Sequence, residues 1–402
     1  MLNKIIITFF IIWIGAVVFF ISNQVQVEST NYALLSKTRS ETALASDSTM
    51  PIKVGVSFTN DENSEVKNID FKNGIELAVN IINQDGLLNG RKIELIYDEY
   101  PNDIESAKEV SRDFSKNLDI VATISNSETN IAIPMSIDYE FSGLTFISTA
   151  ATDPLFTRDS FNYIFRNVTD DIFMAKSLAK LADNLQYENM VVLHSKSKYG
   201  NTLSNVFIQK GTELGINMIY RTSFSDGDRI FKKVISKISP SKNKDIDYDA
   251  IFIAGDLSSV SNLIIQLRES GIYAPIITGH NLDNNKLLEI GDAANGVIVP
   301  TYFNLDILNF KTQEFIKIYK DKYNLLPSSH SVEGFDSISL LSEAIKKAKT
   351  TEPSDVSESL KYIGNFESIS GDYSLNTKGD VVNKNIFFKK VINNRFKFLN
   401  IK

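Results

Sequence analysis

Short apolar runs alternate with helical stretches along the sequence from Ile52 to about Lys349. The runs are rich in β-branched residues, and apolar residues at helical spacing follow most of them. This order is typical of parallel sheets, because each parallel strand needs a crossover helix before the next strand. The sequence therefore predicts an α/β fold class with parallel sheets flanked by helices, the strands being residues 52–58, 92–98, 119–125, 144–148, 190–194, 250–255 and 296–300.

The stretch between the first two strands shows the helical pattern most clearly. Phe71, Ile75, Ala78 and Ile82 recur on one face of a helix, and we expect them to be core residues. Beyond the alternating region, residues 366–400 favour β-structure at the edge of a lobe. A chain of 402 residues with 43% hydrophobic residues has apolar material for more than one core, so we expect two lobes.

Composition and motifs exclude several classes of function. The net charge of −7 offers no basic face to a phosphate backbone, so nucleic acid is not an expected partner. The chain has no cysteine and only three widely spaced histidines, His194, His280 and His330, so no metal site or other cofactor is expected. The dinucleotide, phosphate-loop and serine-hydrolase motifs are also missing from the sequence, and we expect a protein that is not an enzyme.

The N-terminal segment predicts export. Residues 5–21 are almost entirely apolar and follow Lys4, and as a helix they would span about 26 Å, slightly less than a hydrocarbon core. The segment is interpreted as an uncleaved membrane anchor or a removed signal, with a buried core helix as a third alternative. No small-x-small cleavage site follows directly, which favours the anchor. Lys4 on the short side of the segment favours an N-terminus in the cytoplasm. We expect residues 1–22 to be the anchor or uncleaved signal and residues 23–50 to be a flexible tether.

Six segments, read in order, resemble one known family. They are VGVSF, GIELAVNIINQDGLLNGRKIELIYDE, ISTAATDP, HSKSKYGN, DAIFIAGD and EGFDSISLLSEAI. Their order is similar to that of the type I periplasmic binding proteins, most closely the branched-chain amino-acid (Leu/Ile/Val) binding subfamily of ABC transporters. The resemblance covers roughly residues 52–385.

This resemblance implies two Rossmann-like lobes that close on a ligand and are joined by three crossings of the chain. The crossings are expected near residues 165–168, 278–280 and 327–331. Lobe 1 would then comprise residues 51–166 and 279–328, and lobe 2 residues 167–278 and 329–402.

Lobe 1 is expected to hold a ligand carboxylate. Ligands of open parallel sheets bind beyond the carboxyl ends of the strands, where helix N-termini favour anions. Ser125 and Ser127 follow one predicted strand, and Ala150, Ala151 and Thr152 follow the next. The hydroxyl groups of Ser127 and Thr152 and the backbone groups of the two alanines are the expected donors. The alternative is that these segments only cap a helix and turn the chain.

Three further residues are candidates through the resemblance. Phe58 would line the pocket beside the ligand side chain, although FTNDENSEVKN replaces the usual turn there, so the subfamily's side-chain specificity is not carried over. Tyr199 matches an aromatic position near the ligand, and its alternative role is to pack at a helix start. The family's acid for the ligand ammonium is replaced by Ser259, so Asp256 would substitute for it or serve only as a helix cap.

The expected function is capture of a small polar ligand, an amino acid or a related carboxylate or amide, for an ABC importer. A membrane permease or receptor would be the protein partner. The expected location is periplasmic or extracytoplasmic, with tethering to the inner membrane through residues 5–21. The alternatives are a ligand-sensing receptor and a protein-binding regulator of envelope enzymes with the same fold.

Overall fold

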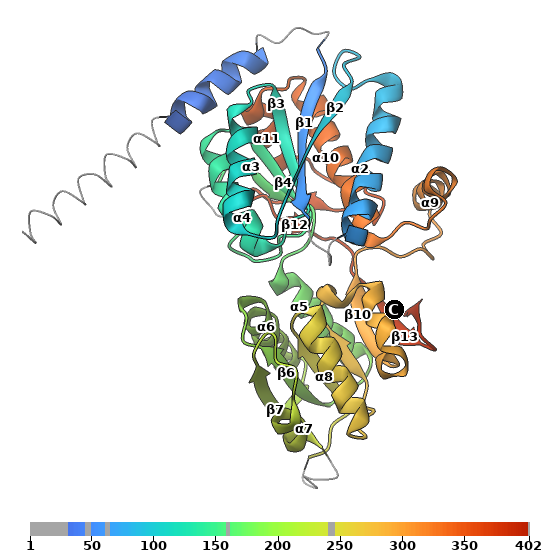
Figure 1. The fold of residues 1–402 in the computed structure, drawn as a ribbon. Helices are drawn as coiled ribbons and strands as arrows, with labels where there is room; N and C mark the ends of the chain where they lie inside the picture. The colour runs from blue at the N-terminus through green and yellow to red at the C-terminus, as the bar shows by residue number, and fades with distance from the viewer. Residues whose placement is uncertain (1–30, 45–49, 61–64, 158–160, 240–245, 401–402) are drawn as a thin grey trace, which may run out of the picture.

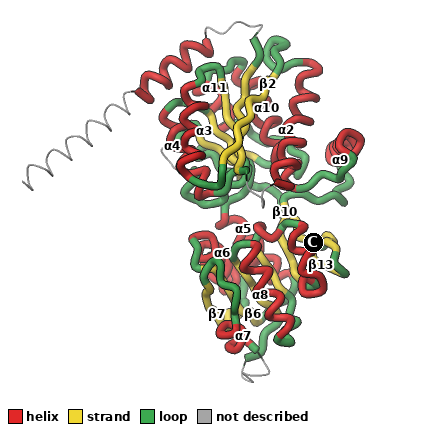
Figure 2. The backbone as a smooth tube through the Cα atoms, in the orientation of Figure 1, coloured by secondary structure: helices red, strands yellow, loops and turns green. Residues whose placement is uncertain are grey.

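Two α/β lobes lie one above the other in the computed structural model, which describes residues 31–44, 50–60, 65–157, 161–239 and 246–400 (Figure 1). Each lobe has a sheet with helices on both sides of its strands (Figure 2). Strands buried on both faces need continuous apolar runs, and IVATIS and AIFIA are runs of this kind. The α/β fold class predicted from the alternation is thus confirmed.

Lobe 1 contains a parallel sheet of five strands in the order β2-β1-β3-β4-β5. The strands are β1 (Ile52–Thr59), β2 (Ile93–Tyr100), β3 (Ile120–Ser125), β4 (Thr145–Ser148) and β5 (Ile164–Arg166). The helices of this lobe are α2 (Glu65–Asp85), α3 (Ile104–Lys116), α4 (Thr129–Phe141), α9 (Phe310–Tyr323), α10 (Ser329–Ala348) and α11 (Pro353–Lys361). A short ribbon of β11 (Ser374–Leu375) and β12 (Val381–Val382) completes it.

Lobe 2 contains seven strands in the order β14-β13-β10-β9-β8-β6-β7. The strands are β6 (Asn189–Ser195), β7 (Asn217–Phe224), β8 (Ala250–Ala254), β9 (Ile276–Thr278), β10 (Val297–Thr301), β13 (Phe387–Ile392) and β14 (Arg395–Phe398). The helical elements are α5 (Asp171–Asn184), α6 (Lys198–Glu213), α7 (Lys232–Ile238), α8 (Leu257–Glu269), η1 (His280–Leu282) and η2 (Asn285–Ala294). β13 runs antiparallel to β10, and β14 forms the edge of the sheet.

The seven predicted strands are all present, with ends within two residues of the predicted ones. The sequence reading missed β5, β7 and β9. β5 and β9 have only three residues each, and β7 (NMIYRTSF) is partly polar because it is the edge strand at the other end of the sheet.

Two of the three predicted crossings are wrong. The chain passes between the lobes after β5, between β10 and α9, and between β12 and β13. Residues 279–301 belong to lobe 2, because β10 pairs with β9 and β13 of that sheet. Residues 329–382 belong to lobe 1, because α10 packs along α2 and shares its apolar core.

The close contact of α2 and α10 depends on two glycines. A Cβ atom added to Gly74 would lie 1.9 Å from the carbonyl oxygen of Ser331, and one added to Gly334 would lie 2.3 Å from that of Phe71. The two backbones therefore touch at this crossing, which brings the N-terminal turns of both helices to the same edge of lobe 1.

The tether predicted at residues 23–50 is wrong for residues 31–44, which form a helix attached to lobe 1. The buried Arg39 guanidinium donates hydrogen bonds to the carbonyl oxygens of Ser115 at 2.5 Å, Ile120 at 2.6 Å, Asn117 at 3.2 Å and Ser142 at 3.3 Å. These carbonyl groups end α3 and α4 and begin β3, so one side chain fixes this helix to three elements.

The predicted anchor at residues 5–21 lies outside the described residues. Among the residues that the structure does describe, no helix has the length and apolar character needed to span a membrane.

Candidate functional site

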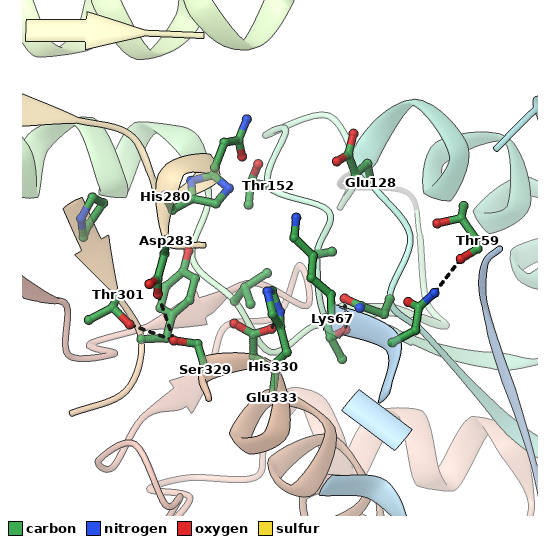
Figure 3. Close-up of a pocket in the computed structure, with 18 of the residues that line it drawn as sticks. Thr59, Lys67, Glu128, Thr152, His280, Asp283, Thr301, Ser329, His330 and Glu333 are labelled. Carbon is green, nitrogen blue, oxygen red and sulfur yellow. Dashed lines mark hydrogen bonds and ion pairs between the residues drawn. The ribbon is translucent and has the colours of Figure 1, made fainter. Parts of the chain in front are cut away.

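A cavity of about 350 Å³ lies between the two lobes (Figure 3). Its walls come from the ends of β1, β3 and β4 in lobe 1, from the ends of β9 and β10 in lobe 2, and from the first turns of α2 and α10. The carboxyl ends of parallel strands are where open α/β sheets bind ligands, and the volume is in the range of small-molecule sites.

The wall of lobe 1 includes two of the predicted residues, Ala150 and Thr152. The backbone donors predicted at the two alanines are already engaged, because the N–H groups of Ala150 and Ala151 donate to the Ser148 hydroxyl at 3.3 and 3.0 Å. Ala151 is fully buried and does not line the cavity. The Thr152 N–H donates to the Thr129 hydroxyl at 3.1 Å, so the loop is held rigid with Thr152 at the cavity wall.

Three predicted residues of lobe 1 lie behind this wall. The Ser125 and Ser127 hydroxyls are 2.6 Å apart and completely buried, and Ser127 also bonds to the Tyr100 hydroxyl. Phe58 packs edge to face against Phe71 in the core. Since neighbouring strand residues point to opposite faces, it is the next residue, Thr59, that reaches the cavity.

Asn126 and α4 complete the wall of lobe 1. Asn126 lines the cavity, and its side-chain oxygen accepts a hydrogen bond from the Thr149 hydroxyl at 3.1 Å. The N-cap residue of α4 is Glu128, whose side chain makes no capping bond and is exposed at the cavity edge. The partial positive charge of this helix N-terminus is therefore directed to the cavity without a capping side chain.

The predicted residues of lobe 2 do not line the cavity. Tyr199 packs edge to face on His280, with ring centroids 5.5 Å apart and its hydroxyl 3.5 Å from Nδ1 of His280. Asp256 is the N-cap of α8 and accepts a hydrogen bond from the Ser259 N–H at 2.9 Å, so the capping alternative describes its position. Tyr199 supports a lining residue, whereas Asp256 stabilises a helix start.

His280, Asn281, Thr301 and Tyr302 form the lobe 2 wall instead. Burial lowers the pKa of His280 to about 4, so its imidazole is neutral at pH 7. The Tyr302 hydroxyl is 3.0 Å from that of Thr169. The sequence reading missed these residues because it treated the region after β9 as a crossing rather than as a strand exit within lobe 2.

The helix N-termini supply the charged part of the wall. Lys67 comes from α2, and Ser329, His330 and Glu333 come from α10. Nδ1 of His330 is 2.9 Å from a carboxylate oxygen of Glu333. The one weak signal in the sequence is the pair of serines before His330, which is typical of a helix N-cap and lies where a crossing of the chain is expected.

Polar contacts that involve acidic side chains join the lobes around the cavity. The Ser329 hydroxyl donates to the Asp283 carboxylate of lobe 2 at 3.0 Å, and the same carboxylate pairs with Lys389. Lys198 of α6 forms an ion pair with Asp153 of lobe 1 at 2.5 Å.

Asp171, at the start of α5, is the acid that the sequence reading missed. It is 3% exposed, its N–H donates to the Thr152 carbonyl oxygen at 2.9 Å, and one of its carboxylate oxygens has no hydrogen-bond partner among the described residues. Burial raises the pKa of Asp171 to about 7, and the Thr152 hydroxyl and Arg166 offset part of this effect. A buried carboxylate with an unused acceptor thus lies next to a residue that lines the cavity.

The described part of the chain holds no group of three or more His, Asp or Glu side chains placed to bind a metal ion. The cavity residues are instead hydrogen-bonding groups of both charges, which suit a small ligand with a carboxylate and an ammonium group.

Comparison with known proteins gives a consistent result. A family model described as periplasmic binding protein matches residues 51–395. The Leu/Ile/Val-binding protein homolog 1 of Brucella abortus (strain 2308) is 26% identical over 332 residues, which are 82% of this chain and 87% of that protein. The leucine-, isoleucine-, valine-, threonine-, and alanine-binding protein of Pseudomonas aeruginosa is 26% identical over 319 residues, which are 77% of this chain and 82% of that protein.

Solved structures show the same architecture. An ABC transporter substrate-binding protein from Desulfitobacterium hafniense, crystallised in complex with Leu, superposes with a TM-score of 0.78 at 27% identity, covering 87% of this chain and all of that one. A leucine binding protein from Thermotoga maritima has a TM-score of 0.76 at 25% identity, and the match covers 87% of this chain and 97% of that one.

Proposed function

Because the chain belongs to the periplasmic binding protein family, we propose that it captures an amino-acid-like solute between its lobes and delivers it to an ABC importer. The family consists of solute-binding proteins, and this chain is a binding protein rather than an enzyme. Family membership also implies a periplasmic location.

The observation that carries the proposal is the cavity, to which both lobes contribute residues at the carboxyl ends of their strands. Thr59 and Thr152 come from lobe 1 and His280 and Tyr302 from lobe 2, so a ligand that contacts residues of both lobes stabilises the closed arrangement. Binding energy is thereby converted into a closed shape that a permease can distinguish from the open one.

The ligand carboxylate is assigned to the wall of Thr152 and the N-terminus of α4. The Thr152 side chain and the uncapped helix N-terminus favour an anion at this position. The ligand ammonium is assigned to Asp171, whose free carboxylate oxygen lacks a partner among the described residues. With these assignments, the carboxylate and the ammonium group of a zwitterionic ligand would contact neighbouring residues, Thr152 and Asp171, near the carboxyl ends of the strands.

Residues 5–21 are proposed to anchor the protein in the inner membrane. The helix at residues 31–44 is fixed to lobe 1 through Arg39, near the start of β3 and so away from the strand exits that line the cavity. An anchor that precedes this helix would hold lobe 1 and leave the cavity and lobe 2 free to move.

The test is calorimetric titration of the twenty amino acids into the full chain, followed by titration of Thr152→Val. Loss of a hydroxyl that bonds a charged group costs about 1.5 to 3 kcal/mol, so the affinity should fall at least about tenfold. Thr222→Val, in β7 and away from the cavity, is the matched control and should bind as the wild type does.

Two results would contradict the proposal. If no amino acid binds the folded protein, the solute class is wrong. If Thr152→Val binds as tightly as the wild type, the carboxylate does not lie at this wall.

A further inference from the structure

The cavity wall is unusually polar for a site that would hold an aliphatic side chain. Its apolar contributions come from Ala150, Val168, Pro300 and the ring of Tyr302, and the remaining lining side chains carry hydroxyl, amide, imidazole or charged groups. A branched aliphatic group placed there would remove water from these polar groups without offering them hydrogen bonds, which is costly.

Lys67 is a charged residue of this wall whose ammonium group has no partner among the described residues. It lies in the first turn of α2, is partly exposed, and extends its ammonium group into the cavity (Figure 3). Within the described ranges it forms no hydrogen bond or ion pair. A cation near a helix N-terminus is disfavoured by the helix dipole, so Lys67 does not stabilise α2 by its charge.

The acids around Lys67 are engaged elsewhere or face away from it. Glu333 bonds to His330, and Asp283 is paired with Lys389 and Ser329. One turn along α2, Asp70 is directed to the hydroxyl groups of Ser328 and Tyr319.

Glu128 and His280 also line the cavity. Glu128, the N-cap residue of α4, is exposed at the edge of the cavity, above Lys67 in the view of Figure 3, and forms no ion pair with it. The His280 imidazole, lowered in pKa by its burial, is neutral and adds no charge. An anion inside the cavity would therefore be the direct partner of the Lys67 ammonium.

We propose that the cavity selects an amino acid whose side chain carries a carboxylate, and that Lys67 binds this second carboxylate. The inference rests on the proposed function, in which Thr152 and the N-terminus of α4 already hold the α-carboxylate. A ligand with two anionic groups then satisfies both positions at once, and Lys67 determines specificity rather than general amino-acid affinity.

The experiment titrates L-aspartate, L-glutamate, L-glutamine and L-leucine into the full chain and into Lys67→Met, which retains most of the apolar stem. In the wild type, the tighter of the two acidic amino acids should bind at least about tenfold more strongly than L-leucine and L-glutamine, since hydrogen bonds between charged groups are the strong ones. Lys67→Met should lose about tenfold or more of that affinity and bind L-leucine within about threefold of the wild type.

Lys72→Met is the matched control on the same helix. The Lys72 ammonium is 3.6 Å from the Glu99 carboxylate and 5.2 Å from the centre of the Phe58 ring, and it does not line the cavity. This variant should bind every probe as the wild type does.

Five outcomes would overturn the inference. If the wild type prefers L-leucine, or binds L-glutamine as well as the acids, the charge of the side chain is not what is selected, although the proposed function stands. If Lys67→Met weakens L-leucine and the acids equally, Lys67 binds the α-carboxylate instead. If none of the four probes binds while another amino acid does, the inference alone fails; if no amino acid binds at all, the proposed function fails with it.

Discussion

At the scale of one residue, the buried Asp171, proposed above to bind the ligand ammonium, should lower the stability of the folded protein when it is ionised. Its pKa is raised to about 7 by burial, whereas an aspartate in an unfolded chain titrates near 4. The folded protein therefore holds a proton that the unfolded chain releases at pH values between about 4 and 7, and its stability falls as the pH rises through this window. Above pH 7 the buried carboxylate is ionised at full cost.

Asp171→Asn tests this account. The variant should have a higher melting temperature than the wild type at pH 8, and the difference should shrink towards pH 4, where both forms are uncharged. It should also bind amino acids more weakly, because the ammonium loses its counter-charge. Thermal unfolding without ligand at the two pH values, together with titration calorimetry, measures both effects.

The control for this variant is Asp183→Asn, an exposed acid on the same helix. It should change the melting temperature by a similar small amount at both pH values. A destabilised Asp171→Asn at pH 8, or one with unchanged ligand affinity, would contradict the role given to this carboxylate.

At the scale of elements, the crossing of α2 and α10 places the charged part of the site. The contact through Gly74 and Gly334 leaves no room for a side chain. Because the two helices touch there, Lys67 of one and His330 of the other reach the same cavity. The hydrophobic pattern of each helix shows which of its faces is buried, but not which element packs against that face. The crossing of α2 and α10 therefore cannot be predicted from either pattern.

Gly74→Ala should separate the two helices. The new methyl group meets the Ser331 backbone, which cannot move aside as a flexible side chain could, so we expect a loss of about 2 to 3 kcal/mol of unfolding free energy. Denaturant unfolding measures this loss. Asn80→Ala, at an exposed position of the same helix, should be neutral or slightly stabilising. Equal stability of the two variants would mean that the crossing relaxes without cost.

At the scale of the whole molecule, the three crossings meet at one buried lysine. The Lys384 ammonium donates to the Asn167 carbonyl oxygen at 2.6 Å and lies 5.5 Å from the centre of the Tyr302 ring, so it joins residues of all three connections. Burial lowers the pKa of this lysine. The three connections between the lobes therefore lie close together around this side chain.

The ion pair between Lys198 and Asp153 is the contact that closure should strengthen. Lys198→Ala should weaken ligand binding by no more than about fivefold, because its side chain is 58% exposed and such pairs contribute little. The effect should fade in high salt. Titrations at low and high ionic strength measure it. Lys210→Ala, whose partner Glu213 lies on the same helix, should change nothing at either ionic strength.

The sequence by itself determined the fold class, most of the strands and the family, because buried parallel strands and amphipathic helices leave local patterns that need no knowledge of distant contacts. It also located Ala150 and Thr152, since a loop at a strand exit follows from the strand. Which neighbouring side chain faces the cavity was decided by tertiary packing: Thr59 rather than Phe58, and Asn126 rather than Ser125 or Ser127.

The tertiary structure alone decided the opposing walls. Lys67, Thr152 and His280 line one cavity because segments far apart in the chain fold against each other, and no local periodicity encodes such a contact. The same holds for the crossings and for the helix at residues 31–44. In the sequence, Arg39 cannot be distinguished from an exposed polar residue. Only the tertiary structure shows that carbonyl groups of α3, α4 and β3 surround its guanidinium group.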